Sequence, residues 1–291
     1  MATTAERIGT QRNILGEGPI WDVTEQALYW VDGEGRQIWR HDPASGAIKS
    51  WEVPDTIGSM ALRARGGAIL ALKTGIHLFD FDSGRTTPVA NPEGNDPRTR
   101  FNDGKVDARG RFICATIDAE LTKPLGSLYR VDADLSCTRL DSGFALSNGP
   151  CWSPDDATFY FSDSRLATIF RFDYDVAAGT VSGRRVFADT RPLGGMPDGC
   201  TVDAHGRLWS ALIGTGKVAC FNPDGSVDHL LDVPPQLVTS VMFGGRNLDI
   251  LYVTSIGGFP AEGIEPGEAD GGLWAIHGLG VRGRPETRFA G

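Results

Sequence analysis

The 291-residue chain lacks any apolar run near the roughly 20 residues that a bilayer-spanning helix requires. Its first residues, MATTAERIGTQ, have neither the basic start nor the apolar stretch of a secretory signal peptide. The five cysteines are odd in number and form no Cys-x-x-Cys pair, which favours a reducing compartment over a disulfide scaffold. We therefore expect a cytoplasmic protein with no membrane partner.

Blocks of like charge are also missing. The 28 basic and 37 acidic residues give a net charge of −9 that is spread along the chain, so a nucleic-acid partner is not expected. The sequence contains no Gly-x-Ser-x-Gly turn, no His-Glu-x-x-His helix and no Gly-x-x-x-x-Gly-Lys loop. These absences argue against a serine hydrolase of that type, a zincin protease and a P-loop nucleotide enzyme.

Short strand-like runs recur along the chain, whereas long helical periodicity is scarce and glycine is abundant at 38 residues. The runs begin at Leu28, Ile69, Phe112, Phe159, Leu208 and Leu251. A period of roughly 45 residues with about four short strands per unit is the pattern of a β-propeller blade. We therefore predict an all-β, six-bladed β-propeller with four antiparallel strands per blade, formed by residues 1–291 as one domain. A pair of β-sandwiches is the alternative.

Polar residues recur about ten positions before these runs. The residues at this position are Glu17, Ser59, Asn102, Asn148, Asp198 and Ser240. The innermost strands of a propeller line its central channel, so equivalent positions form a ring around one axis. Asp198-Gly199, which by itself is typical of a hairpin turn, is then predicted to be a channel position. Aligning the glycines of FNDGKVD and PDGCTVD would place Asp103 in the ring instead of Asn102, and the sequence leaves this choice open.

Three of these residues offer hard oxygen ligands. Carboxylate and amide oxygens that converge in a channel are costly to desolvate unless a partner satisfies them. We predict that Glu17, Asn148 and Asp198, with water, hold one divalent metal ion: calcium, zinc, manganese, magnesium or iron(II). The alternative is that they are ordinary turn and cap residues beside glycine.

Several separated motifs resemble those of one known family. LGEGPIWD, RFNDGKVDARGR, LSNGP, MPDG and GGLWAIHGLGVRG occur in the order found in the senescence-marker-protein/regucalcin/gluconolactonase family, and the resemblance covers nearly the whole chain. It implies a six-bladed propeller with a divalent metal ion on the three ligands named above. It also implies sugar-lactone contacts from Arg100, Asn102 and a carboxylate that matches Glu120, although Asp118 could take its place.

The predicted function is metal-dependent hydrolysis of a sugar lactone to its aldonic acid. The metal ion would polarise the lactone carbonyl, and Asp198 would be both a ligand and the general base. Arg100 would present planar donors to substrate oxygens, while Asn102 can both donate and accept. Two alternatives stay open: a non-catalytic calcium-binding propeller, and a related metal-dependent esterase or phosphotriesterase. We expect a monomer or small homo-oligomer, with the long segment 256–272 over the channel mouth.

Overall fold

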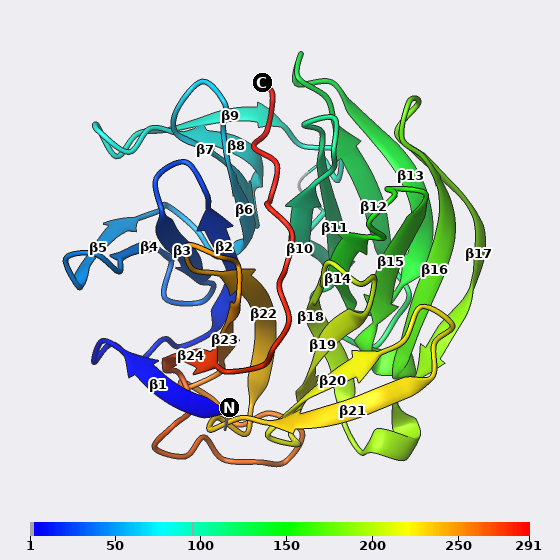
Figure 1. The fold of residues 1–291 in the computed structure, drawn as a ribbon. Helices are drawn as coiled ribbons and strands as arrows, with labels where there is room; N and C mark the ends of the chain where they lie inside the picture. The colour runs from blue at the N-terminus through cyan, green and yellow to red at the C-terminus, as the bar shows by residue number, and fades with distance from the viewer. Residues whose placement is uncertain (1–2, 95) are drawn as a thin grey trace.

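The computed structural model describes residues 3–94 and 96–291. Its strands form six four-stranded antiparallel sheets that surround a central axis as the blades of a propeller (Figure 1). This arrangement confirms the predicted six-bladed β-propeller with four strands per blade. Among the described residues, no helix is long and apolar enough to cross a bilayer.

Each of the first three blades is one continuous stretch of chain. Blade 1 consists of β2 (Gly16–Asp22), β3 (Ala27–Asp32), β4 (Gln37–Asp42) and β5 (Ala47–Glu52). Blade 2 consists of β6 (Ile57–Leu62), β7 (Ala68–Leu72), β8 (Gly75–Phe79) and β9 (Thr86–Ala90). Blade 3 consists of β10 (Thr99–Val106), β11 (Phe112–Asp118), β12 (Gly126–Val131) and β13 (Cys137–Phe144).

Blades 4 and 5 repeat this pattern, and two short 3-10 helices lie between their strands. Blade 4 consists of β14 (Ser147–Trp152), β15 (Thr158–Asp163), β16 (Thr168–Asp175) and β17 (Thr180–Asp189). Blade 5 consists of β18 (Met196–Val202), β19 (Leu208–Ile213), β20 (Lys217–Phe221) and β21 (Val227–Asp232). The 3-10 helices are η1 (Ser164–Leu166) and η2 (Arg191–Leu193).

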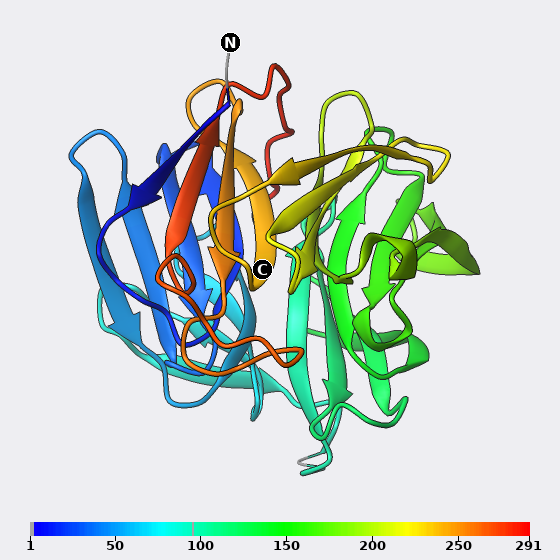
Figure 2. The same cartoon turned by 90° about the horizontal axis from the view of Figure 1, so that it is seen from below.

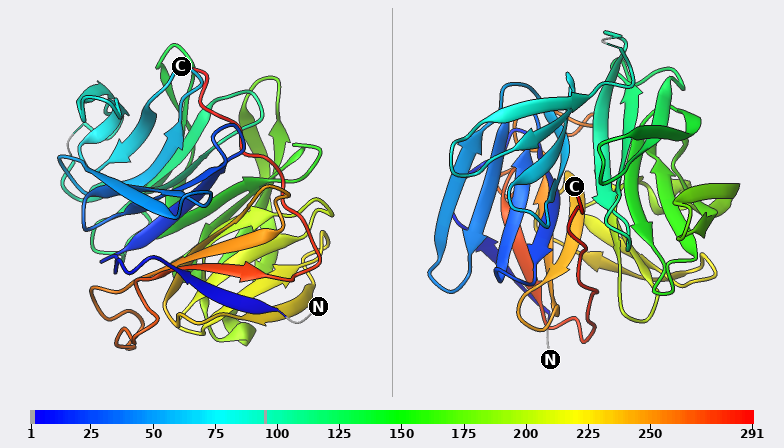
Figure 3. Two further views of the ribbon diagram at one scale, coloured as in Figure 1. Left: turned by 60° about the vertical axis from the view of Figure 1, so that its left-hand side comes forward. Right: turned by 90° about the horizontal axis from the view of Figure 1, so that it is seen from above.

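Blade 6 takes its outermost strand from the other end of the chain. Its inner strands are β22 (Val238–Gly244), β23 (Ile250–Ser255) and β24 (Leu273–His277). β1 (Thr4–Ile8) pairs antiparallel with β24, with Ile8 opposite Leu273 (Figure 3, left). The ring of blades is therefore closed by hydrogen bonds between two distant parts of the chain.

The core consists of apolar clusters between neighbouring blades. Tyr29 and Val31 of blade 1, for example, pack in one cluster with Met60 and Leu70 of blade 2. Burial decreases outward within a blade: every residue of β3 is buried, whereas β5 is mostly exposed. Burial of each large apolar side chain in these clusters contributes about 1.5–3 kcal/mol.

Every innermost strand is irregular at the predicted ring position. The register with the second strand shifts at residues 17–20, 57–59, 101–104, 148–151, 197–200 and 238–240. Such a β-bulge adds one residue to a strand, bends it and re-aims its side chains. Asp198-Gly199 is therefore part of a bulge in β18, not a hairpin turn.

The C-terminal segment, residues 278–291, contains no strand and crosses one end of the channel (red in Figure 1). It hydrogen-bonds to at least one residue of every blade, including Asp22, Leu62, Gly110, Ser153, Ala204 and Leu248. These residues stand at the end of the innermost strands or in the turns that follow them. The segment therefore ties all six blades together at the end of the channel where the innermost strands finish.

Candidate active site

A cavity of about 270 Å³ opens at the other end of the channel. Its floor is formed by five of the six predicted site residues: Glu17, Arg100, Asn102, Asn148 and Asp198. They come from the first halves of β2, β10, β14 and β18. The long segment 256–272 covers part of the mouth through Phe259–Glu262, as predicted, and Figure 2 shows this loop (orange) and the C-terminal segment (red) at opposite ends of the strands.

The two carboxylates proposed for the last lactone contact lie outside this cavity. Glu120 is exposed in the connection between β11 and β12 and is not part of the lining. Asp118 is buried, and its Oδ2 accepts hydrogen bonds from the backbone N–H of Thr122 at 2.8 Å and of Lys123 at 2.7 Å. Its carboxylate therefore holds this connection together, and the residue of the connection that reaches the cavity is Leu121.

Asn102 and Asp103 together form the bulge of β10, and their side chains line different cavities along the channel. Asn102 lines the open cavity, whereas Asp103 lines a small cavity beneath it. The Asp103 carboxylate accepts hydrogen bonds from the N–H of Gly104 at 2.7 Å and of Gly149 at 2.8 Å. The sequence left open whether Asn102 or Asp103 faces the channel. Both do, at different heights: Asn102 at the cavity floor and Asp103 below it.

The amide of Asn148 is held in one orientation. Its Nδ2 donates to Ser164 Oγ at 2.8 Å, and Ser164 Oγ donates to the carbonyl of Pro197 at 2.5 Å. The Oδ1 atom of Asn148 accepts from Asn102 Nδ2 at 2.6 Å. Ser164 thus links the strands that carry Asn148 and Asp198, and sequence analysis missed this residue because it lies outside the ring position.

The surroundings of the two acidic residues at the floor disfavour their ionised form, and the charge of Arg100 offsets this effect only in part at Glu17. Burial raises the pKa of Glu17 well above its usual range, and the charges of Asp198 and Asp103 raise it further. Burial and the charge of Asp103 likewise raise the pKa of Asp198. Within residues 3–94 and 96–291, no lysine or arginine forms an ion pair with Glu17 or Asp198, and Arg100 hydrogen-bonds to Asn102 Oδ1 at 3.1 Å instead.

These residues fit a divalent cation. Two carboxylates that oppose each other's ionisation and an oriented amide oxygen together supply the hard oxygen donors that calcium, magnesium or manganese prefers. A bound cation would supply the missing positive charge and favour the ionised form of both carboxylates. The ligand set predicted from the sequence, Glu17, Asn148 and Asp198, is therefore chemically consistent with a metal ion.

A second group of possible ligands lies on the outer strands of blade 5. Ligand atoms of Cys220, Asp228 and His229 lie within 4.8 Å of one another. Arg207 Nη1 lies 3.4 Å from Asp228 Oδ2, and its Nε is paired with Asp203 at 2.8 Å. Because this guanidinium already neutralises the carboxylate, the outer group is less suited to a divalent cation than the channel floor.

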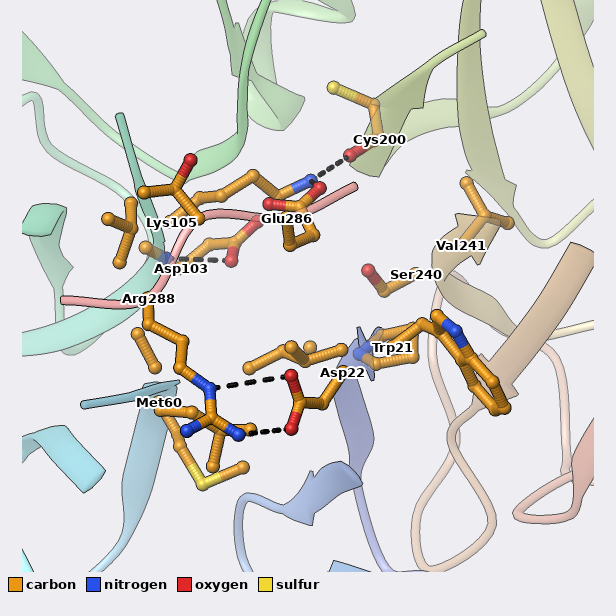
Figure 4. Close-up of a pocket in the computed structure, with 18 residues that line it drawn as sticks. Trp21, Asp22, Met60, Asp103, Lys105, Cys200, Ser240, Val241, Glu286 and Arg288 are labelled. Carbon is orange, nitrogen blue, oxygen red and sulfur yellow. Dashed lines mark hydrogen bonds and ion pairs between the residues drawn. The ribbon is translucent and has the colours of Figure 1, made fainter. Parts of the chain in front are cut away.

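The channel beneath the floor is filled by side chains and by the C-terminal segment. Lys105 Nζ lies 3.5 Å from Glu286 Oε1 and donates to the carbonyl of Cys200 at 3.1 Å, while Arg288 pairs with Asp22 (Figure 4). The cavities left there measure about 30 and 70 Å³, against about 270 Å³ at the open end. Of the two ends of the channel, the open end therefore has more room for a bound molecule.

Comparisons with known proteins identify the family of this chain. Residues 15–257 match the family model described as SMP-30/Gluconolactonase/LRE-like region. The chain is 35% identical to regucalcin of Gallus gallus, covering 98% of both chains, and 37% identical to the pentonolactonase of Haloferax volcanii, covering 94% of both.

A solved structure shows the same fold. The calcium-binding protein regucalcin from Agrobacterium tumefaciens superposes with a TM-score of 0.91 at 27% identity, covering 98% of this chain and 97% of that one. The family match extends over most of the chain and includes every residue of the cavity floor. The chain therefore belongs to the SMP-30/gluconolactonase/LRE-like family.

Proposed function

We propose that this protein hydrolyses a sugar lactone to the corresponding aldonic acid and that it depends on one divalent metal ion. The observation that carries the proposal is the floor of the open cavity, where the carboxylates of half-buried Glu17 and buried Asp198 converge with an oriented amide and an arginine. The similarity to a pentonolactonase supports a lactone as the substrate. Glu17, Asn148 and Asp198 are the proposed ligands, and the metal is calcium, zinc, manganese, magnesium or iron(II).

The chemistry requires an activated carbonyl and an activated water. A divalent cation at the floor supplies Lewis acidity, which polarises a carbonyl oxygen or lowers the pKa of a water. Asp198 is the proposed general base, because its carboxylate stands at the floor and can accept the proton of the attacking water. After the ring C–O bond breaks, Asp198 returns this proton to the departing ring oxygen.

Arg100 and Asn102 are the proposed substrate contacts. Arg100 enters the cavity from β10 and presents N–H donors that suit carbonyl or hydroxyl oxygens. Asn102 hydrogen-bonds to both Arg100 and Asn148. It therefore fixes the position of a proposed substrate contact, Arg100, relative to a proposed metal ligand, Asn148. No role in binding is proposed for Glu120, since it does not line the cavity.

Hydrolysis of a panel of aldonolactones, followed by pH-stat titration with and without chelator, tests the proposal. We expect lactone hydrolysis above the spontaneous rate, loss of this activity after chelation and recovery when a divalent metal is restored. Adding aryl esters and phosphotriesters tests the related-esterase alternative. Hydrolysis of these alone would overturn the lactonase proposal.

A non-catalytic calcium-binding protein is the second candidate, favoured by similarity to a solved calcium-binding regucalcin. This function predicts calcium binding at the floor with no turnover of any substrate in the panel. Calorimetric titration of the metal-free protein, run beside the activity assay, separates the two functions.

A further inference from the structure

The wall of the cavity directly above the polar floor is mostly apolar. The residues two positions before the floor residues lie at or just before the start of the innermost strands, and they form the next level of the lining toward the mouth. These positions are Leu15, Arg100, Leu146 and Met196, and all four line the cavity. Three of the four sides at this level are therefore hydrocarbon, and from the fourth side Arg100 extends to the floor, where its Nη1 donates to Asn102 Oδ1.

The apolar surface continues to the mouth. Ile213, at the end of β19, and Ile256, just after β23, also line the cavity. Both are buried in one apolar cluster with Leu237, against which Leu15 also packs. The apolar wall is therefore held in place by the core and is not a set of loose side chains. Phe259, 38% exposed, extends it to the opening.

Few hydrogen-bonding groups are left for substrate hydroxyls. With Glu17, Asn148 and Asp198 engaged as ligands, the floor offers Arg100 and Asn102, and the Asn102 amide already donates to the Ser147 carbonyl at 2.9 Å. At the mouth, Arg165 pairs with Glu262 at 3.4 Å and donates to the Leu121 carbonyl at 3.0 Å. A hydroxyl placed against the apolar wall would lose its water partners without replacement, which costs roughly tenfold or more in binding.

We propose that the preferred substrate is a deoxy lactone, with its hydroxyls near the carbonyl and an alkyl group at the far end of the molecule. The inference rests on the proposed lactone hydrolysis and names its substrate class. With the carbonyl on the floor beside Arg100, the far end contacts Leu146, Met196 and Ile213. Each methylene buried against this wall raises kcat/KM about fourfold.

Matched lactones that differ in one oxygen atom test this proposal. The pairs are L-rhamnono- against L-mannono-1,4-lactone and L-fucono- against L-galactono-1,4-lactone, each metal-saturated and corrected for spontaneous hydrolysis. We expect the methyl-ended lactone of each pair to have a kcat/KM at least about tenfold higher. Equal values, or a preference for the hydroxymethyl-ended lactone, would overturn this inference and leave lactone hydrolysis standing. Hydrolysis of none of the four lactones would also overturn this inference, and the wider aldonolactone panel would then decide the proposed function.

Substitutions in the wall provide the second arm. Met196→Gln and Leu146→Gln keep the approximate size of two half-buried lining side chains and add an amide, so each should reduce the preference for the methyl-ended lactone about tenfold. Leu230→Gln on β21, 37% exposed and outside the cavity, is the control and should keep the wild-type preference. Metal content and circular dichroism of all three variants should match wild type. Folded wall variants that retain the full preference would show that the wall does not select the substrate.

Discussion

Asp198 and Glu17 share one environment but are proposed to do different chemistry. Burial raises the pKa of both, and both are proposed ligands at the floor. Only Asp198 is proposed to carry the proton of the attacking water. A carboxylate-to-amide substitution keeps an oxygen ligand at each position but removes the proton acceptor, so the two roles can be separated.

We predict that Asp198→Asn stays at least about a hundredfold slow in kcat even at saturating metal, because general-base assistance contributes about 10²–10⁴-fold. Glu17→Gln, changed only as a ligand, should recover much more of its kcat as the metal concentration rises. The measurement is kcat against metal concentration for both variants. Near wild-type kcat of metal-saturated Asp198→Asn would make Asp198 a ligand only.

The raised pKa of Glu17 also predicts a pH effect on the metal-free protein. A carboxyl whose pKa is higher in the folded than in the unfolded chain binds its proton more tightly when folded. Its contribution to stability is therefore full below the unfolded pKa, about 4.3, and is lost as the pH rises through the folded pKa.

We accordingly expect Glu17→Gln to lose less stability than wild type between pH 5 and pH 8 when both are metal-free. At pH 8 the variant should have the higher melting temperature, by about 2–4 °C for each kcal/mol of repulsion removed. Saturating metal should reverse the order, because only wild type keeps both carboxylate ligands. Thermal melts with and without chelator measure this. Parallel pH profiles would show that Glu17 does not titrate abnormally.

At the scale of strands, the site depends on how closely the innermost strands approach one another. Gly58 in β6 faces the backbone of Asn102 in β10, and a Cβ atom at Gly58 would lie 2.4 Å from the Asn102 carbonyl oxygen and 2.7 Å from its nitrogen. Backbone atoms cannot turn aside as a side chain can. A glycine in blade 2 therefore sets the position of a floor residue in blade 3.

Gly58→Ala should displace Asn102 and cost about 1–3 kcal/mol of stability, as overpacking of a tight core does. We also expect a lower kcat/KM on the best lactone, since the bond between Asn102 and Asn148 would be disturbed. Gly267→Ala is the matched control, because a Cβ there meets only Asp270 Oδ2, at 3.6 Å. The measurements are the denaturant midpoint and kcat/KM of both variants. Equal values for the two would show that the absence of a side chain at Gly58 does not set the position of Asn102.

At the scale of the whole molecule, the ring of blades is closed twice. β1 completes blade 6 at the outer edge, and the C-terminal segment bonds to all six blades at one end of the channel. Phe289 anchors this segment: it is fully buried in the apolar cluster between blades 2 and 3. The segment thus stabilises the ring and closes the channel beneath the cavity floor.

Phe289→Ala should lower the free energy of unfolding by about 3–5 kcal/mol, the usual cost of emptying a buried phenylalanine site. Phe259→Ala, which truncates the 38% exposed phenylalanine at the cavity mouth, is the control and should change stability little. Urea denaturation of both variants provides the measurement. A loss no larger for Phe289 than for Phe259 would mean that the segment does not stabilise the ring.

The architecture and most of the cavity floor can be predicted from the amino-acid sequence. Both follow from local spacing: one blade repeats about every 45 residues, and equivalent positions of the innermost strands must share one axis. That rule alone brought Glu17, Asn148 and Asp198 together across more than half of the chain. The bulges reinforce it, because every innermost strand is bent at the same position.

Which of two neighbouring side chains reaches the cavity depends, in contrast, on the tertiary structure. Asn102 and Asp103 are adjacent in sequence, and the bulge of β10 sends one to the floor and the other below it. Asp118 ends β11 and its carboxylate is held by hydrogen bonds from the connection that follows, whereas Glu120 lies in that connection and is exposed. Ser164 acts across two blades. These outcomes depend on contacts between segments far apart in the chain, which no local pattern of residues encodes.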